Sequence, residues 1–122
     1  MTSTGNANQS DRLRVEHGVV DGVRVVTVQG EIDHAVTDVL REALHFEDGT
    51  PPPLRIVMDL SGVPFMDSSG INVLVAAYQQ VNETQGWIRI AGAQESVVRL
   101  LELVGIDAVI TCHPSIEQAL SA

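Results

Sequence analysis

The sequence contains no lysine. All 7 of its basic residues are arginine, and they face 16 aspartate and glutamate residues, so the formal net charge is −9 at pH 7. A protein that binds the phosphate backbone of a nucleic acid needs a basic face, and so does one that adheres to an anionic membrane surface. The composition therefore argues against nucleic-acid and membrane partners, and it leaves a basic protein partner open.

Cysteines and long apolar runs are also scarce. The single cysteine, Cys112, cannot form an internal disulfide, which suits a reducing cytosol. No apolar run is long enough to span a bilayer. Met1 to Ser10 are rich in serine, threonine, asparagine and glycine and lack the apolar core of a signal peptide. We expect a cytoplasmic protein with a disordered leader at Met1 to Ser10 and one domain over residues 11–122.

Aromatic residues make up only 3% of the sequence, although 44% of its residues are hydrophobic. The core must therefore be built from valine, leucine, isoleucine and alanine. Segments with strand and helix periodicity alternate along the chain. The predicted strands are Leu13 to Val20, Val23 to Gln29, Leu54 to Leu60, Trp87 to Ala91 and Asp107 to Thr111. The first predicted helix is capped by Asp33 and has its apolar positions between Val36 and Leu44. The other predicted helices are Ser68 to a C-cap at Gly86, Ser96 to Val104, and a last one with Pro114 in its first turn.

The order of these segments predicts the fold class. The first two strands flank Asp21-Gly22, the dipeptide most typical of a tight hairpin turn. Strands and helices then alternate, and such βα units form parallel strand pairs through right-handed crossovers. We therefore expect an α/β fold with a mixed sheet of about five strands and four helices, in which an opening β-hairpin precedes the βα units.

The most informative segment runs from Ile56 to Ile71 and reads IVMDLSGVPFMDSSGI. An apolar strand passes into a short loop, the loop ends in Asp67-Ser68-Ser69-Gly70, and a helical pattern begins at once. Asp67 is a natural N-cap, so Ser68 is predicted to be the first helical residue. Free backbone N–H groups and the helix dipole favour negative charge at that position. The site would suit a phosphate carried covalently by serine.

Together with Gly30-Glu31-Ile32-Asp33, this segment resembles the STAS domain of the anti-sigma factor antagonists, over roughly Leu13 to Leu120. The resemblance implies the STAS fold, and it implies that a partner kinase phosphorylates Ser68. It also implies that Asp33, which follows a strand as Asp67 does, lies near the phosphoserine and helps to engage the kinase. Capping of the first helix by Asp33 is the simpler role, and both roles can hold. Glu31 is a weaker candidate.

The resemblance implies a binding switch and not an enzyme, with no cofactor. The unphosphorylated protein is expected to bind an anti-sigma factor that is also an ATP-dependent serine kinase, and so to free a sigma factor for bacterial transcription. Phosphorylation would weaken this complex, and a protein serine phosphatase would reset it. Two alternatives stay open: a STAS subunit of a transport or scaffold assembly that works without phosphorylation, and a STAS module that binds a small ligand.

Residues around Ser68 are predicted to form the partner-binding surface, namely Asp33, Asp67, Ser69 and Gly70. One helical step turns a side chain by about 100°, so Ser68 and Ser69 cannot face a docked kinase equally. Ser69 is expected to make local hydrogen bonds. Gly70 would let a partner's backbone or nucleotide phosphates approach the helix start, or it would pack against the neighbouring loop. The sequence leaves both interpretations of Gly70 open.

Other kinds of site lack the residues that they need. The P-loop of nucleotide-binding proteins requires a lysine. A two-component receiver matches this chain in size, acidity and βα alternation, but receivers carry a lysine late in the chain. The four histidines show no ligand spacing, so no metal site is expected. Asp67-Ser68-Ser69-Gly70 is not the Gly-x-Ser-x-Gly motif of serine hydrolases, and Cys112 is not expected to be a nucleophile.

Overall fold

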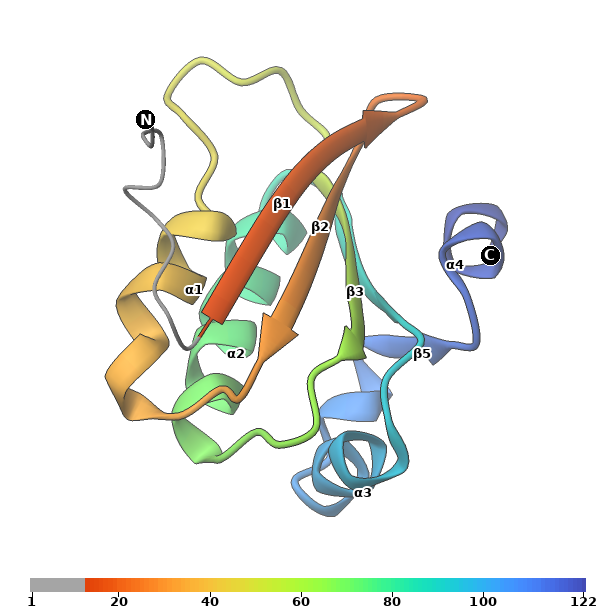
Figure 1. Cartoon of the computed structure of the whole chain (residues 1–122). Coiled ribbons are helices and arrows are strands. Elements are labelled where there is room, and N and C mark those ends of the chain that lie inside the picture. Colours follow the sequence, from red (N-terminus) through yellow and green to blue (C-terminus); the bar gives the residue numbers. More distant parts are fainter. Residues whose placement is uncertain (1–12) are drawn as a thin grey trace.

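A computed structural model describes residues 13–122, and the expected leader, Met1 to Ser10, lies outside the described residues. The strands are β1 (Leu13–Val20), β2 (Val23–Gly30), β3 (Arg55–Gly62), β4 (Trp87–Ala91) and β5 (Thr111–His113), and the α-helices are α1 (Thr37–Ala43), α2 (Ser68–Asn82), α3 (Glu95–Leu103) and α4 (Ile116–Ser121). The sheet order is β1-β2-β3-β4-β5 (Figure 1). The first pair is antiparallel and the other pairs are parallel, which confirms the predicted mixed α/β sheet.

The hairpin between β1 and β2 turns at the predicted dipeptide. Asp21 and Gly22 both have positive φ angles, 51° and 80°. Two consecutive residues with positive φ are what a type I′ turn requires, and the twist of this turn matches that of the two strands. Val20 consequently lies opposite Val23, and the ladder runs without a shift to Leu13 opposite Gly30.

The helices cover the two faces of the sheet unequally, with α1 and α2 on one face and α4 on the other (Figure 1). The larger core lies under α1 and α2, and α3 contributes Val97 and Leu101 to it. This core is aliphatic, as the composition predicted, and no polar or charged residue among residues 13–122 is buried. Within the same range, no helix combines the length and the apolar character needed to cross a membrane.

Helix α4 is held against the second face by a small apolar cluster and by Arg89. The guanidinium carbon of Arg89 lies 3.6 Å from the centroid of the Trp87 ring. The same guanidinium donates a hydrogen bond of 2.9 Å to the carbonyl oxygen of Ala119. A cation at the last turn of a helix is also favoured by the helix dipole. This short helix is therefore fixed to β4.

The predicted last strand, Asp107 to Thr111, was wrong. Ile106–Ala108 form a 3-10 turn (η2), and β5 begins only at Thr111. The N–H of Ile110 donates to the carbonyl oxygen of Ile106 at 2.9 Å, and both isoleucines are buried. Their spacing of four residues matches one helical turn, whereas a strand would have placed buried residues at alternate positions.

Two predicted helix boundaries also differ. Pro114 precedes α4, and Ser115 is the N-cap, its Oγ accepting a hydrogen bond of 3.2 Å from the N–H of Gln118. Gly86 is not the C-cap of α2, because the residue in the left-handed region is Gln85. A Cβ atom on Gly86 would collide with the backbone carbonyl of Leu54. A glycine is therefore required at position 86 because the backbone of Leu54, just before β3, approaches it closely, and not because the end of α2 needs a positive φ there.

Candidate functional site

The candidate site is built on the start of α2. Asp67 is the N-cap, and its Oδ1 accepts a hydrogen bond of 2.8 Å from the N–H of Ser69. Ser68 is the first residue of the helix and is exposed, whereas Ser69 is half-buried. The predicted cap and helix start are therefore confirmed. Of the two serines, Ser68 is the more accessible to a docked protein.

Asp33 occupies a corresponding position after β2. Its Oδ1 accepts a hydrogen bond of 3.0 Å from the N–H of Ala35. Asp33 is thereby the N-cap of a 3-10 turn, His34–Val36 (η1), which continues into α1. The predicted capping role is confirmed, with the difference that Asp33 caps the 3-10 turn before the α-helix.

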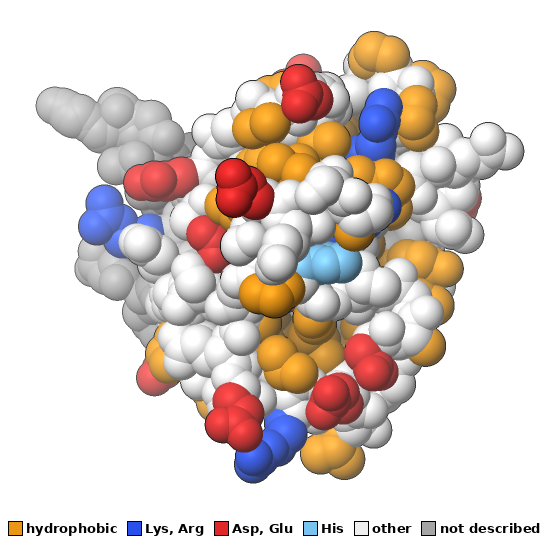
Figure 2. All heavy atoms as spheres, turned by 90° about the vertical axis from the view of Figure 1, so that its right-hand side faces the viewer, with side chains coloured by type: hydrophobic (Ala, Val, Ile, Leu, Met, Phe, Trp, Pro, Cys, Tyr) orange, Lys and Arg blue, Asp and Glu red, His pale blue; other side chains and the backbone are white. Residues whose placement is uncertain are grey.

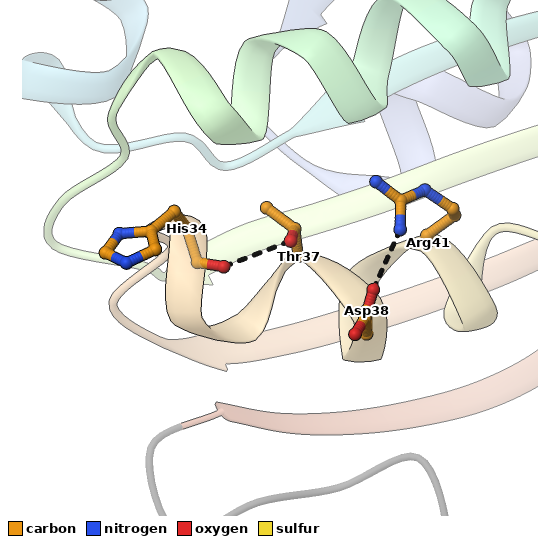
Figure 3. Close-up of polar contacts among 4 residues, drawn as sticks. All are labelled: His34, Thr37, Asp38 and Arg41. Atoms are coloured by element: carbon orange, nitrogen blue, oxygen red, sulfur yellow. Dashed lines mark hydrogen bonds and ion pairs between the residues drawn. The ribbon is translucent and has the colours of Figure 1, made fainter.

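Polar contacts along η1 and α1 fix the segment that follows Asp33 (Figure 3). The hydroxyl of Thr37 donates to the carbonyl oxygen of His34 at 3.1 Å, which closes the turn. One turn later, Arg41 and Asp38 form an exposed ion pair at 2.9 Å. Such surface pairs contribute little to stability, so the shape of this segment depends mainly on its backbone and capping bonds.

The loops that carry Asp33 and Asp67 are joined by backbone hydrogen bonds. The N–H of Ile32 donates to the carbonyl oxygen of Phe65, and the N–H of Asp67 donates to the carbonyl oxygen of Ile32, both at 3.0 Å. Ile32 and Met66 form an isolated parallel bridge. Figure 1 shows both loops at the same edge of the sheet, beyond the ends of β2 and β3. Because β2 and β3 are parallel neighbours, the two acidic loops share one edge of the sheet.

Gly70 is buried beneath this pair of loops. A Cβ atom at Gly70 would lie 2.8 Å from Cγ2 of Ile32 and 2.7 Å from Cγ of Met66. The first turn of α2 therefore packs on both loops more closely than any larger residue would allow. Close packing accounts for this glycine, and its contact with a partner stays a prediction.

Helix α3 anchors the loop between β3 and α2 from the other side. The hydroxyl of Ser96 donates to the carbonyl oxygen of Pro64 at 3.0 Å, and Nε2 of Gln94 donates to the carbonyl oxygen of Ser61 at 2.9 Å. The loop that leads to Ser68 is thus held by the Asp33 loop and by α3. The sequence did not predict these contacts, because polar residues at a helix start are common and nothing in their spacing identifies a distant acceptor.

The charge of the site is negative. Glu31, Asp33 and Asp67 lie close to Ser68 in the two joined loops, and no basic residue occurs between Arg55 and Arg89 in the sequence. Figure 2 shows the face that carries α4 and β5, where acidic side chains are spread widely and basic ones are few. A partner that approaches Ser68 therefore meets the carboxylates of Glu31, Asp33 and Asp67, which favour a partner with neutral or basic groups.

The metal-ligating side chains of the described residues form no cluster, and the cysteine favours its thiol form. Within residues 13–122 no group of three or more histidine, cysteine, aspartate or glutamate residues could hold a metal ion. Burial raises the pKa of the half-buried Cys112 thiol, and the negative charges of Asp107 and Glu102 raise it further. A raised pKa disfavours the thiolate, which is the nucleophilic form of cysteine.

A surface hollow of about 430 Å³ lies at the opposite edge of the sheet from Ser68. It is lined by residues of β1, of the start of β2 and of the segment after α1, among them His17, Arg24, His45 and Glu47. Strand β2 begins at this edge, whereas Ser68 follows the end of the parallel strand β3. The hollow is therefore not part of the candidate site.

Comparison with known proteins gives a consistent result. The family model of the STAS domain matches residues 14–119. The chain is 28% identical over 109 residues to an anti-sigma F factor antagonist of Paenibacillus polymyxa, covering 89% of this chain and 93% of that protein. It is 33% identical over 85 residues to an anti-sigma-B factor antagonist of Bacillus subtilis, covering 70% and 76%. A crystal structure of an anti-sigma factor antagonist from Mycobacterium paratuberculosis matches with a TM-score of 0.80 and 30% identity, covering 93% and 95%.

Proposed function

Because this chain belongs to the STAS domain family, we propose that it acts as an anti-sigma factor antagonist. One observation carries the proposal. Ser68 is exposed at the start of α2, and the acidic loop that leads to it is joined by backbone hydrogen bonds to the acidic loop of Asp33. The relatives compared above are named anti-sigma factor antagonists, which favours this function over a transport assembly or a ligand-binding module. Sigma factors act on RNA polymerase, so the chain and its partner would meet in the cytoplasm.

In the proposed cycle, the unphosphorylated chain binds an anti-sigma factor and thereby frees a sigma factor. The anti-sigma factor is also proposed to be an ATP-dependent serine kinase. The hydroxyl oxygen of Ser68 attacks the γ-phosphorus of ATP, the bond to the β-phosphate oxygen breaks, and the hydroxyl proton is lost as ADP leaves. A phosphatase later hydrolyses the phosphoserine. The chain supplies the acceptor and is not itself the enzyme.

The phosphate is proposed to act at the interface rather than by refolding the domain. A phosphoserine adds about −1.5 to −2 charge. The start of α2 can hold this charge where it stands, because the helix dipole places partial positive charge at the N-terminus of the helix. Asp67 and Asp33 place like charge beside it, and no basic residue lies between Arg55 and Arg89 in the sequence for the phosphate to recruit. A partner surface shaped for a neutral hydroxyl would then meet both charge and bulk.

Release of a sigma factor tests the proposed function. The unphosphorylated protein should be added to purified complexes of an anti-sigma factor with its sigma factor, taken from the same organism. We expect one such complex to lose its sigma factor as the antagonist concentration rises, seen by size-exclusion chromatography and as restored transcription in vitro. If every anti-sigma factor of the organism keeps its sigma factor and none binds the protein, the proposed function is wrong.

A further inference from the structure

Phe65 differs from the other aromatic side chains of this protein. All four aromatic residues of the sequence lie within residues 13–122, and of these Phe46 is buried while Tyr78 and Trp87 are half-buried. Phe65 is 48% exposed. Its neighbour Pro64 is exposed as well. The two residues form an apolar ridge beside the acidic and hydroxyl residues of the candidate site, in a protein with very few aromatic residues to place.

The backbone of this ridge is fixed, so the exposure of Phe65 does not come from a loose loop. The carbonyl oxygen of Phe65 accepts the hydrogen bond from Ile32, and the carbonyl oxygen of Pro64 accepts the one from Ser96, both at 3.0 Å. Met66 follows in the Ile32 bridge with its side chain buried. Successive side chains of an extended segment point to opposite sides, so burying Met66 turns Phe65 outward.

The ridge is also continuous with the proposed partner site. Phe65 and Ser68 are three residues apart, so their Cα atoms are separated by at most about 11 Å. Asp33 lies in the loop whose Ile32 bonds to Phe65. The surface thus combines an apolar aromatic group with a surrounding of acidic and hydroxyl groups. Protein interfaces commonly have this composition, with aromatic anchors at the centre and polar residues at the rim.

We propose that the ridge of Pro64 and Phe65 anchors the anti-sigma factor, and that the Phe65 ring enters an apolar pocket beside the partner's phosphoryl-transfer site. The inference rests on the proposed function and adds the residue that supplies affinity. In this arrangement Phe65 contributes to binding, whereas Ser68 contributes the group that is modified. Aromatic rings that are desolvated in a pocket are among the interface residues whose truncation to alanine loses most binding free energy.

The test compares three variants in titrations against the anti-sigma factor by isothermal calorimetry. Phe65→Ala is expected to weaken binding about 30-fold or more, as truncation of an interface hot spot does. Phe65→Leu should lose less, because it keeps part of the apolar contact. Leu103→Ala is the control, since Leu103 is 82% exposed but lies about 10 Å further along α3 from Ser96. It should bind like the wild type.

Phosphorylation kinetics separate anchoring from a general structural effect. With Phe65→Ala, KM for the protein substrate should rise while kcat at saturation stays close to the wild-type value, and the melting temperature should change little. If Phe65→Ala binds as tightly as Leu103→Ala and the wild type, the anchoring role of Phe65 is wrong and the proposed function stands. If the wild type itself binds no anti-sigma factor, the proposed function fails and this inference fails with it.

Discussion

Replacing Ser68 by alanine is expected to abolish phosphorylation of the protein while leaving its fold and its partner complex intact. The helix cap is made by Asp67 and the N–H of Ser69, so the Ser68 hydroxyl is not needed to start α2. Alanine is the best helix former, and an exposed substitution of this kind usually changes the free energy of unfolding by less than about 0.5 kcal/mol. Incubation with ATP and the partner kinase, followed by intact mass, should show one added phosphoryl group on the wild type and none on Ser68→Ala.

Ser69→Ala is the matched control for this experiment. Ser69 is half-buried, its N–H is bound by Asp67, and its side chain is turned by about 100° from that of Ser68. The Ser69 variant should therefore still gain one phosphoryl group. A phosphate found on the Ser68→Ala protein, at Ser69 or elsewhere, would overturn the assignment of Ser68.

Replacing Gly86 by alanine is expected to cause the largest loss of stability. The added Cβ would collide with the backbone carbonyl of Leu54. Leu54 cannot move away easily, because its N–H donates to the hydroxyl of Thr84 at 2.9 Å and its carbonyl oxygen accepts from Trp87 at 3.1 Å. Overpacking typically costs about 1–3 kcal/mol, and a clash with fixed backbone should reach the upper end, about 3 kcal/mol. This is a large share of the stability of a small domain.

Urea unfolding followed by circular dichroism measures this loss, and Gly18→Ala provides the control. A Cβ at Gly18 would have no neighbour within 4 Å, and Gly18 lies inside β1. Alanine there should leave stability unchanged or raise it by about 0.5–1 kcal/mol, since glycine weakens a strand interior. Equal unfolding midpoints for the two variants would show that the backbone next to Gly86 adapts.

Turns and helix caps that depend on residues close together in the sequence were predicted correctly. The turn at Asp21-Gly22 depends only on the backbone angles of these two residues, and the Asp67 side chain caps the N–H of a residue only two positions further on. Both features can therefore be identified without knowledge of the fold. The segment from Ile106 to Ile110 could not be assigned this way. A short apolar run fits a strand and a helical turn equally well, and its form is decided by burial of both isoleucines in the core.

The candidate site was predicted in part, for the same physical reason. Ser68 follows from the cap and the motif, and the shared sheet edge of Asp33 and Asp67 follows from parallel pairing. The bonds that join Ile32 to Phe65 and Asp67 involve backbone atoms of residues distant in sequence, which leave no pattern in the side chains. Phe65 is an apolar residue in an apolar stretch, so nothing in the sequence distinguished it from a core residue. The structure was needed to show that it is exposed.

The central claim is that a phosphate on Ser68 controls partner binding at the interface and does not refold the domain. Its most direct test is to titrate the phosphorylated and unphosphorylated proteins against the nucleotide-bound anti-sigma factor, and to record backbone amide spectra of both free forms. Like-charge contacts across an interface are costly, so the affinity should fall at least about tenfold on phosphorylation. The amide shifts should be confined to the start of α2 and the joined Asp33 loop. Equal affinities, or shifts spread through the whole sheet, would contradict this mechanism.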